Sequence, residues 1–371
     1  MMLLLELPLQ SRVLRQPPNQ SPSDLTGKEK ERCMAAQQRL PERWRSWVAE
    51  NILLEADPEQ IENDAVAAGM NRSLVREELK RAQGSPYIEG GRWVMQRVNK
   101  LESLMRIRVE AFRQNKTNAC VPSRHRLPAS TFREKYYALN KPLKILGMVD
   151  DWPAMQKWSP EYFRDNYGEE IVEITSGRDA DPRYEINLDD HRTQMRFADF
   201  IDRVEAGEGN DSYLVANNRF FEQPGMKGLL ADIGPLPGFL TRKKRAPHTY
   251  MWFGPAGTVT PLHHDTMNIL FCQVYGRKLV SLISPDESPW LYNELGVFSE
   301  VDFENPDFEV HPLYQHVDRI EVEMNPGEIL FLPVGWWHHV RSLETSISVS
   351  FTNFVFPNDY EWRQPEIRRD A

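Results

Sequence analysis

Beyond residue 210 the chain is a succession of short apolar runs that are separated by glycine, proline and polar turns. No long helical pattern lies between these runs, and each has the length and composition of a β-strand. Many short strands in sequence predict a sheet that closes into a barrel or packs face to face as a sandwich. The runs lie at 212–218, 248–255, 268–276, 278–285, 320–333 and 346–356.

The first third of the chain follows a helical pattern instead. Apolar residues recur at three- and four-residue spacing between residues 43 and 114, and Asp57-Pro58 is a typical helix start. Residues 91–113 carry one long apolar stripe. We therefore predict a flexible lead-in over 1–30, a helical domain over 31–118 with a linker at 115–130, and a second domain over 119–371.

Composition and charge limit the partners. The 371 residues carry a formal net charge of −9, which argues against nucleic acid because phosphate binding needs a basic field. Residues 1–130 hold 21 Lys+Arg against 16 Asp+Glu, and the remainder holds 24 against 38. Three scattered cysteines indicate a reducing cytoplasm, and we expect neither a signal peptide nor a membrane span. The cysteines are Cys33, Cys120 and Cys272.

Residues 260–280, TPLHHDTMNILFCQVYGRKLV, contain two histidines and an aspartate in a predicted strand. Side chains alternate along a strand, so His263 and Asp265 share one face while His264 takes the other. The segment PVGWWHHV at 333–340 is the obvious source of a third ligand from a distant strand. Two histidines and a carboxylate form the facial triad of non-haem Fe(II) oxygenases, although similar ligands also suit catalytic zinc.

From about residue 141 to 357 the sequence resembles the Jumonji C, cupin-8-like 2-oxoglutarate oxygenases, and among them the asparaginyl hydroxylase that inhibits hypoxia-inducible factor. The matching segments occur in the family's order: KPLKILGMVDDWPA, TPLHHD, CQVYGRK, NPGEILFLPVGWWHHV and SVSFTNF. The resemblance implies a mostly β catalytic domain, a double-stranded β-helix, preceded by the α-helical domain. It also implies that His263, Asp265 and His338 bind Fe(II), with His264 and His339 outside the ligand set.

The resemblance extends to a 2-oxoglutarate pocket. Lys278 matches the lysine that pairs with the distal carboxylate of 2-oxoglutarate, and Thr260 matches a threonine that binds the same group. Tyr213 stands where related enzymes often supply a tyrosine. Two positions depart from the asparaginyl hydroxylase: Ser350 stands where that enzyme has an asparagine, and Asn268 follows Asp265 by three residues instead of four.

The resemblance implies an enzyme that uses Fe(II), 2-oxoglutarate and O₂, releases succinate and CO₂, and hydroxylates a carbon of a peptide or protein side chain. A small-molecule hydroxylase and a demethylase of the same family remain alternatives, because demethylation begins with the same hydroxylation step. A non-catalytic cupin-like binding protein is the alternative from another class. We expect the helices before residue 118 to serve recognition or a homodimer, not chemistry.

Overall fold

The computed structural model describes residues 39–216, 219–243, 245–293 and 296–361. The chain divides into two compact units, and the division falls between residues 105 and 106. This division lies inside one long helix, α5 (Pro86–Gln114), whereas the sequence suggested a boundary near residue 118. The last residues of α5 therefore pack with the second unit: the rings of Phe112 and Trp336 lie 6.2 Å apart.

The first unit contains the helices that the sequence predicted. They are α2 (Glu42–Leu53), α3 (Pro58–Ala67), α4 (Arg72–Gln83) and the beginning of α5. Asp57 accepts a hydrogen bond from the Glu59 amide and Asn71 from the Ser73 and Leu74 amides, so both side chains satisfy free donors at a helix start. The apolar faces meet in a small core of Trp44, Trp47, Val48, Ile52, Ile61, Val75 and Leu79.

Helix α5 begins five residues before the predicted start at residue 91. The residues of its predicted apolar stripe differ in their burial. Val109 is buried, whereas Trp93, Leu101 and Leu104 are exposed by 67%, 63% and 58%. No helix within the described residues combines the length and apolar character needed to cross a bilayer.

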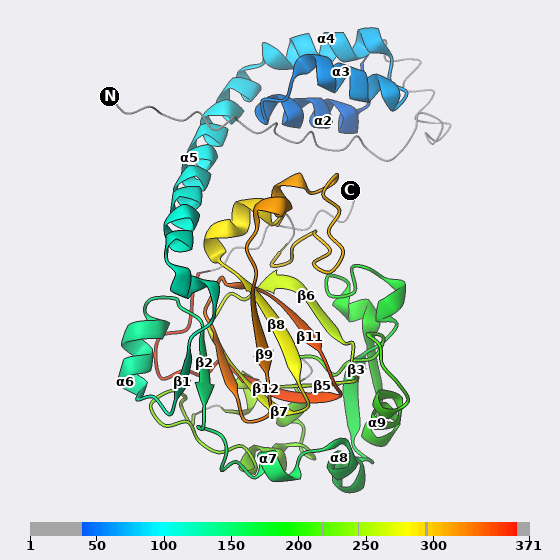
Figure 1. The fold of residues 1–371 in the computed structure, drawn as a ribbon. Coiled ribbons are helices and arrows are strands. Elements are labelled where there is room, and N and C mark those ends of the chain that lie inside the picture. Colours follow the sequence, from blue (N-terminus) through cyan, green and yellow to red (C-terminus); the bar gives the residue numbers. More distant parts are fainter. Residues whose placement is uncertain (1–38, 217–218, 244, 294–295, 362–371) are drawn as a thin grey trace. The chain divides into compact units, whose positions relative to one another are not determined.

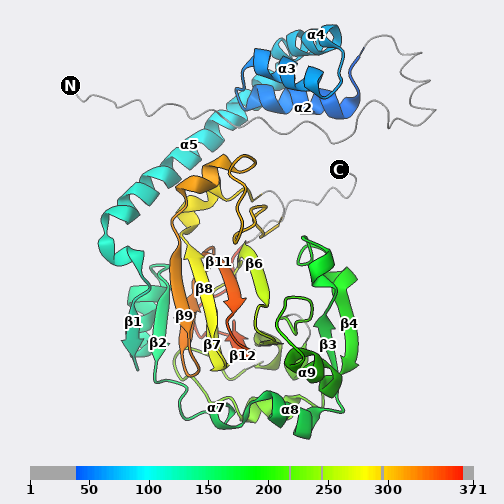
Figure 2. The same ribbon diagram turned by 45° about the vertical axis from the view of Figure 1, so that its right-hand side comes forward.

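The second unit is built on two sheets whose strands come from interleaved parts of the chain (Figures 1 and 2). Every pairing in these two sheets is antiparallel except that of β1 with β2. This arrangement confirms the predicted β-rich domain preceded by helices. The first sheet has the order β1 (Ser123–His125), β2 (Leu143–Leu146), β10 (Ile329–Leu332), β7 (Ile269–Tyr275), β12 (Ser346–Phe351) and β5 (Thr249–Gly254); the second has β6 (Val259–His264), β11 (Trp337–Ser342), β8 (Lys278–Ile283) and β9 (Ile320–Met324).

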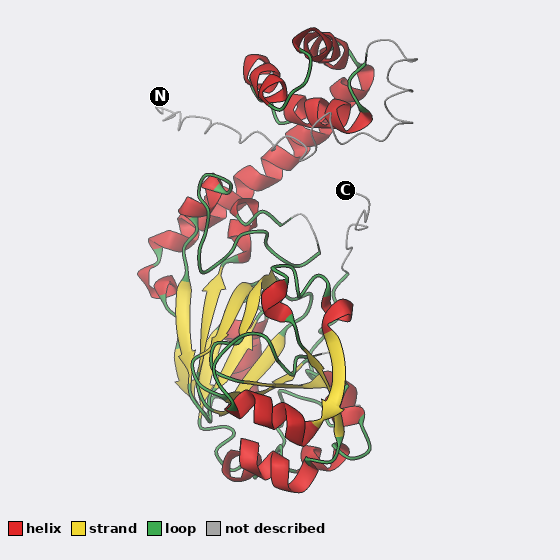
Figure 3. Cartoon of the chain, turned by 90° about the vertical axis from the view of Figure 1, so that its right-hand side faces the viewer, coloured by secondary structure: helices red, strands yellow, loops and turns green. Residues whose placement is uncertain are grey.

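Helices and a small third sheet cover one side of the barrel (Figure 3). Phe163 and Phe197, from two of the covering helices, pack their rings against Phe253 of β5 at centroid distances of 6.1 and 6.0 Å. All three residues belong to the largest apolar core. The covering elements are α6 (Ala129–Phe132), α7 (Ala154–Lys157), α8 (Pro160–Tyr167), α9 (Phe197–Glu205), β3 (Ile171–Thr175) and β4 (Arg192–Arg196).

Two segments differ from the sequence prediction. The predicted linker at 115–130 contains β1, which pairs in parallel with β2. Its three residues are all exposed, so no apolar pattern marked it as a strand. The predicted strand at 212–218 forms only isolated bridges, of Tyr213 with Thr175 and of Leu214 with Phe253, within its described residues.

Candidate metal and cosubstrate site

The barrel contains a cavity of about 380 Å³. Strands β5, β6, β7, β8, β11 and β12 all contribute to its wall. Every site residue proposed from the sequence lies on this wall, although these residues come from positions spread over more than a hundred residues of chain. They are Tyr213, Thr260, His263, Asp265, Lys278, His338 and Ser350.

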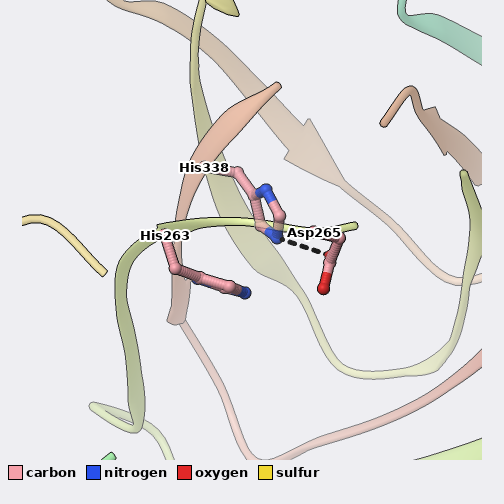
Figure 4. Close-up of side chains that lie close together, drawn as sticks. All are labelled: His263, Asp265 and His338. Carbon is pink, nitrogen blue, oxygen red and sulfur yellow. Dashed lines mark ion pairs between the residues drawn. The ribbon is translucent and has the colours of Figure 1, made fainter. Parts of the chain in front are cut away.

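His263, Asp265 and His338 converge at one place on the cavity wall. Strands β6 and β11 pair so that His263 lies directly opposite His338, and Asp265 follows the end of β6. One ligand atom from each residue lies within 4.8 Å of the other two. Figure 4 shows the two rings and the carboxylate turned toward a common point, with His338 Nε2 3.4 Å from Asp265 Oδ2.

Backbone carbonyl groups orient both imidazole rings. Nδ1 of His263 lies 2.8 Å from the Pro261 carbonyl oxygen, and Nδ1 of His338 lies 3.0 Å from the Trp336 carbonyl oxygen. A carbonyl oxygen only accepts, so each Nδ1 carries the proton and donates it. Nε2 of each ring then presents a lone pair toward the cluster, which is the usual way a protein prepares histidine for a metal.

The charge states of the cluster also suit a metal. Burial, reinforced by the neighbouring His338, lowers the pKa of His263 to about 4. Burial opposes ionisation of Asp265, but its neighbours His338 and His263 outweigh this effect and lower the pKa of the carboxyl group. At neutral pH the cluster therefore contains a neutral His263 ring and a carboxylate, the states that coordinate a divalent cation. These residues fit Fe(II) with open coordination positions.

The two adjacent histidines are engaged elsewhere. The His264 ring packs edge-on against Trp337 at 4.7 Å, and the His339 ring stacks on Phe303 at 4.3 Å. Burial lowers the pKa of both rings. Neither residue belongs to the three-residue cluster among the described residues.

Lys278 forms a second polar centre on the cavity wall. Its side chain is fully buried, and its Nζ donates a hydrogen bond of 2.7 Å to the hydroxyl oxygen of Tyr213. Thr260 lies on the same cavity wall as Tyr213 and Lys278. Among the described residues, no carboxylate lies within 4.0 Å of this amine. A buried cation without an anionic partner is costly, so this end of the cavity is suited to an anion from outside the chain.

A β-bulge brings Thr260 to the cavity. In the register of β6 with β11, His338 lies opposite His263 and Val340 lies opposite Thr260. Three steps along β6 thus correspond to two along β11, so β6 contains one extra residue. Thr260 and His263 differ by an odd number of positions and would point to opposite faces of a regular strand. The bulge lets both line the same cavity.

The two departures from the asparaginyl hydroxylase pattern have different outcomes. Ser350 lines the cavity, and its hydroxyl oxygen accepts a 3.0 Å hydrogen bond from Trp252 Nε1. Asn268 is buried and bonds to Asn358 and the Val334 amide. The next residue, Ile269, lies on the cavity wall. An apolar side chain therefore stands at the fourth position after Asp265.

Sequence reasoning missed a group of residues near the end of the cavity that contains Lys278, which we call the cosubstrate end below. Arg178, Tyr184 and Glu185 lie in the connection between β3 and β4, which carried no recognised motif. Arg178 is buried and forms an ion pair with Glu185 at 3.0 Å. Glu185 is itself part of the cavity wall, and burial raises the pKa of its carboxyl group.

A family model described as a cupin-like domain matches residues 128–355. Lysine-specific demethylase 8 of Xenopus tropicalis is 32% identical over 243 residues, which cover 63% of this chain and 53% of that protein. The Danio rerio protein of the same name is 35% identical over 243 residues, with coverages of 62% and 57%. JmjC domain-containing protein D of Dictyostelium discoideum is 31% identical over 244 residues, with coverages of 59% and 52%.

The chain thus spans about half the length of the curated relatives it matches. The names of these relatives support the resemblance to Jumonji C proteins. They give no support to the particular likeness to the asparaginyl hydroxylase.

Proposed function

Because this chain belongs to the cupin-like domain family and is similar to Jumonji C proteins, we propose that it is an Fe(II)- and 2-oxoglutarate-dependent oxygenase. One observation carries the proposal. A fully buried lysine without a carboxylate partner among the described residues shares a single cavity with a His-Asp-His cluster. That cavity is suited to a metal at one place and to an anionic group at another, which is what 2-oxoglutarate requires.

Each residue has a definite part in this proposal. His263, Asp265 and His338 would hold Fe(II), which when bound supplies the redox chemistry for the reaction with O₂. Lys278 would pair with the distal carboxylate of 2-oxoglutarate, and Tyr213 and Thr260 would donate hydrogen bonds beside it. Ser350 and Trp252 would shape the wall between these groups. The protein itself contributes positioning, exclusion of water and the charge of Lys278.

The overall reaction balances without a protein nucleophile. One oxygen atom of O₂ enters 2-oxoglutarate, which loses CO₂ and becomes succinate, while the other oxygen atom is inserted into a C–H bond of the substrate and forms a hydroxyl group. We propose a peptide or protein side chain as the substrate. Hydroxylation of a side-chain carbon that is not bonded to nitrogen would give a stable product. Hydroxylation of an N-methyl group would give a product that releases formaldehyde.

Demethylation is the second candidate, and the names of the relatives favour it. Two of the similar proteins are called lysine-specific demethylase 8. Both reactions use the same cosubstrate and the same metal, so the cluster and Lys278 do not separate them. A methylated lysine would enter the same cavity, where Trp252 and Phe298 provide aromatic wall.

Intact mass of candidate peptides, measured after incubation with Fe(II), 2-oxoglutarate and O₂, tests both candidates. A gain of one oxygen atom supports hydroxylation, and the loss of a methyl group together with formaldehyde supports demethylation. Succinate release is measured in parallel for the wild-type protein and for Asp265→Ala. Equal succinate release from both proteins, or none from the wild type with any substrate, would instead support the non-catalytic binding protein.

We further propose that the helical unit serves self-association or recognition of the substrate. None of the cavity residues lies in α2, α3 or α4, and Trp93, Leu101 and Leu104 of α5 are exposed apolar side chains. Light scattering of the full chain and of Leu101→Glu tests self-association. A wild-type protein that is monomeric at all concentrations would leave recognition of the substrate as the role of these helices.

A further inference from the structure

Arg178 is a buried cation that the proposed reaction does not yet use. It lies in a 3₁₀ helix (Arg178–Ala180) between β3 and β4, and its side chain has no exposed surface. Its Nη2 donates to Glu185 Oε1 at 3.0 Å and to the Val259 carbonyl oxygen at 2.7 Å. Nε and Nη1 have no hydrogen-bond partner among the described residues. The guanidinium carbon instead lies 4.2 Å from the centre of the Tyr184 ring and 5.1 Å from that of Tyr213.

Each contact of Arg178 leads to a residue at the cosubstrate end of the cavity. The Tyr213 ring, against which the guanidinium stacks, carries the hydroxyl group that accepts from Lys278. Val259, whose carbonyl oxygen is bound, directly precedes Thr260 in β6. Tyr184 donates a second hydrogen bond, of 3.2 Å, to the same carbonyl oxygen. Arg178 itself is not on the cavity wall.

We propose that Arg178 is a positioning residue for 2-oxoglutarate, which holds the hydroxyl groups of Tyr213 and Thr260 beside Lys278 without touching the cosubstrate. This inference rests on the proposed function, because it assigns a partner to the same pocket. The guanidinium group packs against the face of the Tyr213 ring. It also fixes the start of β6 through its hydrogen bond to the Val259 carbonyl oxygen. Both of the neutral groups that accompany Lys278 thus depend on one buried side chain.

An arginine suits this position for two physical reasons. Its planar guanidinium group can stack on two aromatic rings and donate hydrogen bonds in its own plane at the same time, which lysine cannot. The positive charge of Arg178 also interacts strongly with nearby charged groups, because they are close to it and the protein interior has a low dielectric constant. Lys278 and Arg178 are two buried cations against one nearby carboxylate, Glu185. The pocket therefore favours a ligand that brings negative charge.

The charge of Arg178 has a second, measurable effect. Burial, together with the positive charge of Arg178, lowers the pKa of Lys278 to about 7. If the charge of Arg178 is removed, the pKa of Lys278 moves upward toward its ordinary value. Replacing a residue that only supported the fold would lower the stability of the protein and leave the pKa of Lys278 unchanged. The pH dependence of cosubstrate binding therefore separates positioning from structural support.

The experiment compares the full-length wild type with Arg178→Met, Arg178→Lys and a control, Arg245→Met. Arg245 is a partly buried arginine that donates hydrogen bonds to the Leu230 and Ile233 carbonyl oxygens, and it is not on the cavity wall. Each protein is loaded with Mn(II) and titrated with 2-oxoglutarate by calorimetry between pH 6 and 9. Mn(II) affinity and thermal unfolding are measured on the same samples.

We expect Arg178→Met to weaken 2-oxoglutarate binding about tenfold at pH 6.5. This factor is typical of the coupling between residues that belong to one network of contacts. The Mn(II) affinity of this variant should not change, and its loss of 2-oxoglutarate affinity with rising pH should begin at a higher pH than in the wild type. Arg178→Lys retains the charge, so its pH dependence should match the wild type while its affinity remains lowered. Arg245→Met should lower the thermal stability and leave the 2-oxoglutarate affinity and its pH dependence unchanged.

Two results would overturn the inference. One is a 2-oxoglutarate affinity of Arg178→Met equal to that of the wild type. The other is a weakened affinity with an unchanged pH dependence, matched by Arg245→Met. If Arg178→Met does not fold, Arg178→Lys decides alone, and wild-type affinity in that variant contradicts the need for a stacked guanidinium. A wild-type protein that binds no 2-oxoglutarate would instead reject the proposed function.

Discussion

Binding of 2-oxoglutarate should depend on pH because of Lys278. Burial and the charge of Arg178 hold the pKa of this amine near 7 in the protein without ligand. A bound carboxylate favours the charged amine and raises its pKa again, toward or above the ordinary 10.5. The free protein must therefore take up a proton to bind above pH 7. Affinity should be constant below pH 7 and should fall as the pH rises through and beyond it.

The size of the effect follows from one proton per ligand. Each pH unit above the pKa of the free amine weakens binding tenfold, which corresponds to about 1.36 kcal/mol. Between pH 6 and pH 9 the dissociation constant should therefore rise by about a hundredfold, or about 2.7 kcal/mol. The pKa of His263 is lowered to about 4 and that of the Tyr213 hydroxyl is raised by burial, so neither group titrates between pH 6 and pH 9. Burial also raises the pKa of Glu185 on the same cavity wall, and a Lys278→Arg variant, which keeps Glu185, separates its contribution from that of Lys278.

Calorimetric titration of the Mn(II)-loaded protein with 2-oxoglutarate measures this dependence without turnover. At pH 8, titrations in two buffers with different ionisation enthalpies should show the uptake of close to one proton per ligand. Lys278→Arg keeps a charge that does not titrate in this range, so its affinity should not vary with pH. A dissociation constant of the wild type that is flat from pH 6 to 9, or an equal pH dependence in Lys278→Arg, would refute the reasoning.

Three further predictions follow. Asp265→Ala should lose Fe(II) on gel filtration while His264→Ala retains it, as metal analysis of the eluted protein will show; equal loss would place the ligand at His264. Lys278→Ala should weaken 2-oxoglutarate binding by about one to two decades, from about 1.5–3 kcal/mol for a charge-assisted bond, with unaltered Mn(II) affinity. Arg113→Ala should destabilise the fold by about 3 kcal/mol, because it leaves Glu287 buried without its cation. Burial raises the pKa of Glu287 to about 7, above its unfolded value, so this loss should be larger at pH 8 than at pH 5 in thermal unfolding.

Local sequence patterns determined much of this protein. The alternation of short apolar runs was sufficient for a β-rich domain, because strands of this kind must pair to satisfy their backbone groups. Asp57 and Asn71 marked helix starts through a side-chain oxygen within reach of free amides. The period of two along a strand predicted that His263 and Asp265 share one face, and both side chains join the cluster although β6 ends at His264. All of these are interactions between residues close in sequence, which a pattern can reveal.

The cosubstrate pocket depended on contacts between distant parts of the chain. The extra residue in β6 that turns Thr260 into the cavity is visible only from the register with β11. Lys278 meets Tyr213, which stands 65 residues earlier in the sequence. The edge strand β1 has no buried residue, so only its pairing with β2 makes it a strand.

Arg178 shows the same limit most clearly. In the sequence it is one of 45 Lys and Arg residues in a polar segment with no motif, where a solvated side chain is the ordinary expectation. The tertiary structure encloses it between two tyrosine rings and a carboxylate. Local periodicity reports which face of an element is apolar, but the cost of burying a charge depends on which groups from elsewhere surround it. Only folding brings those groups together.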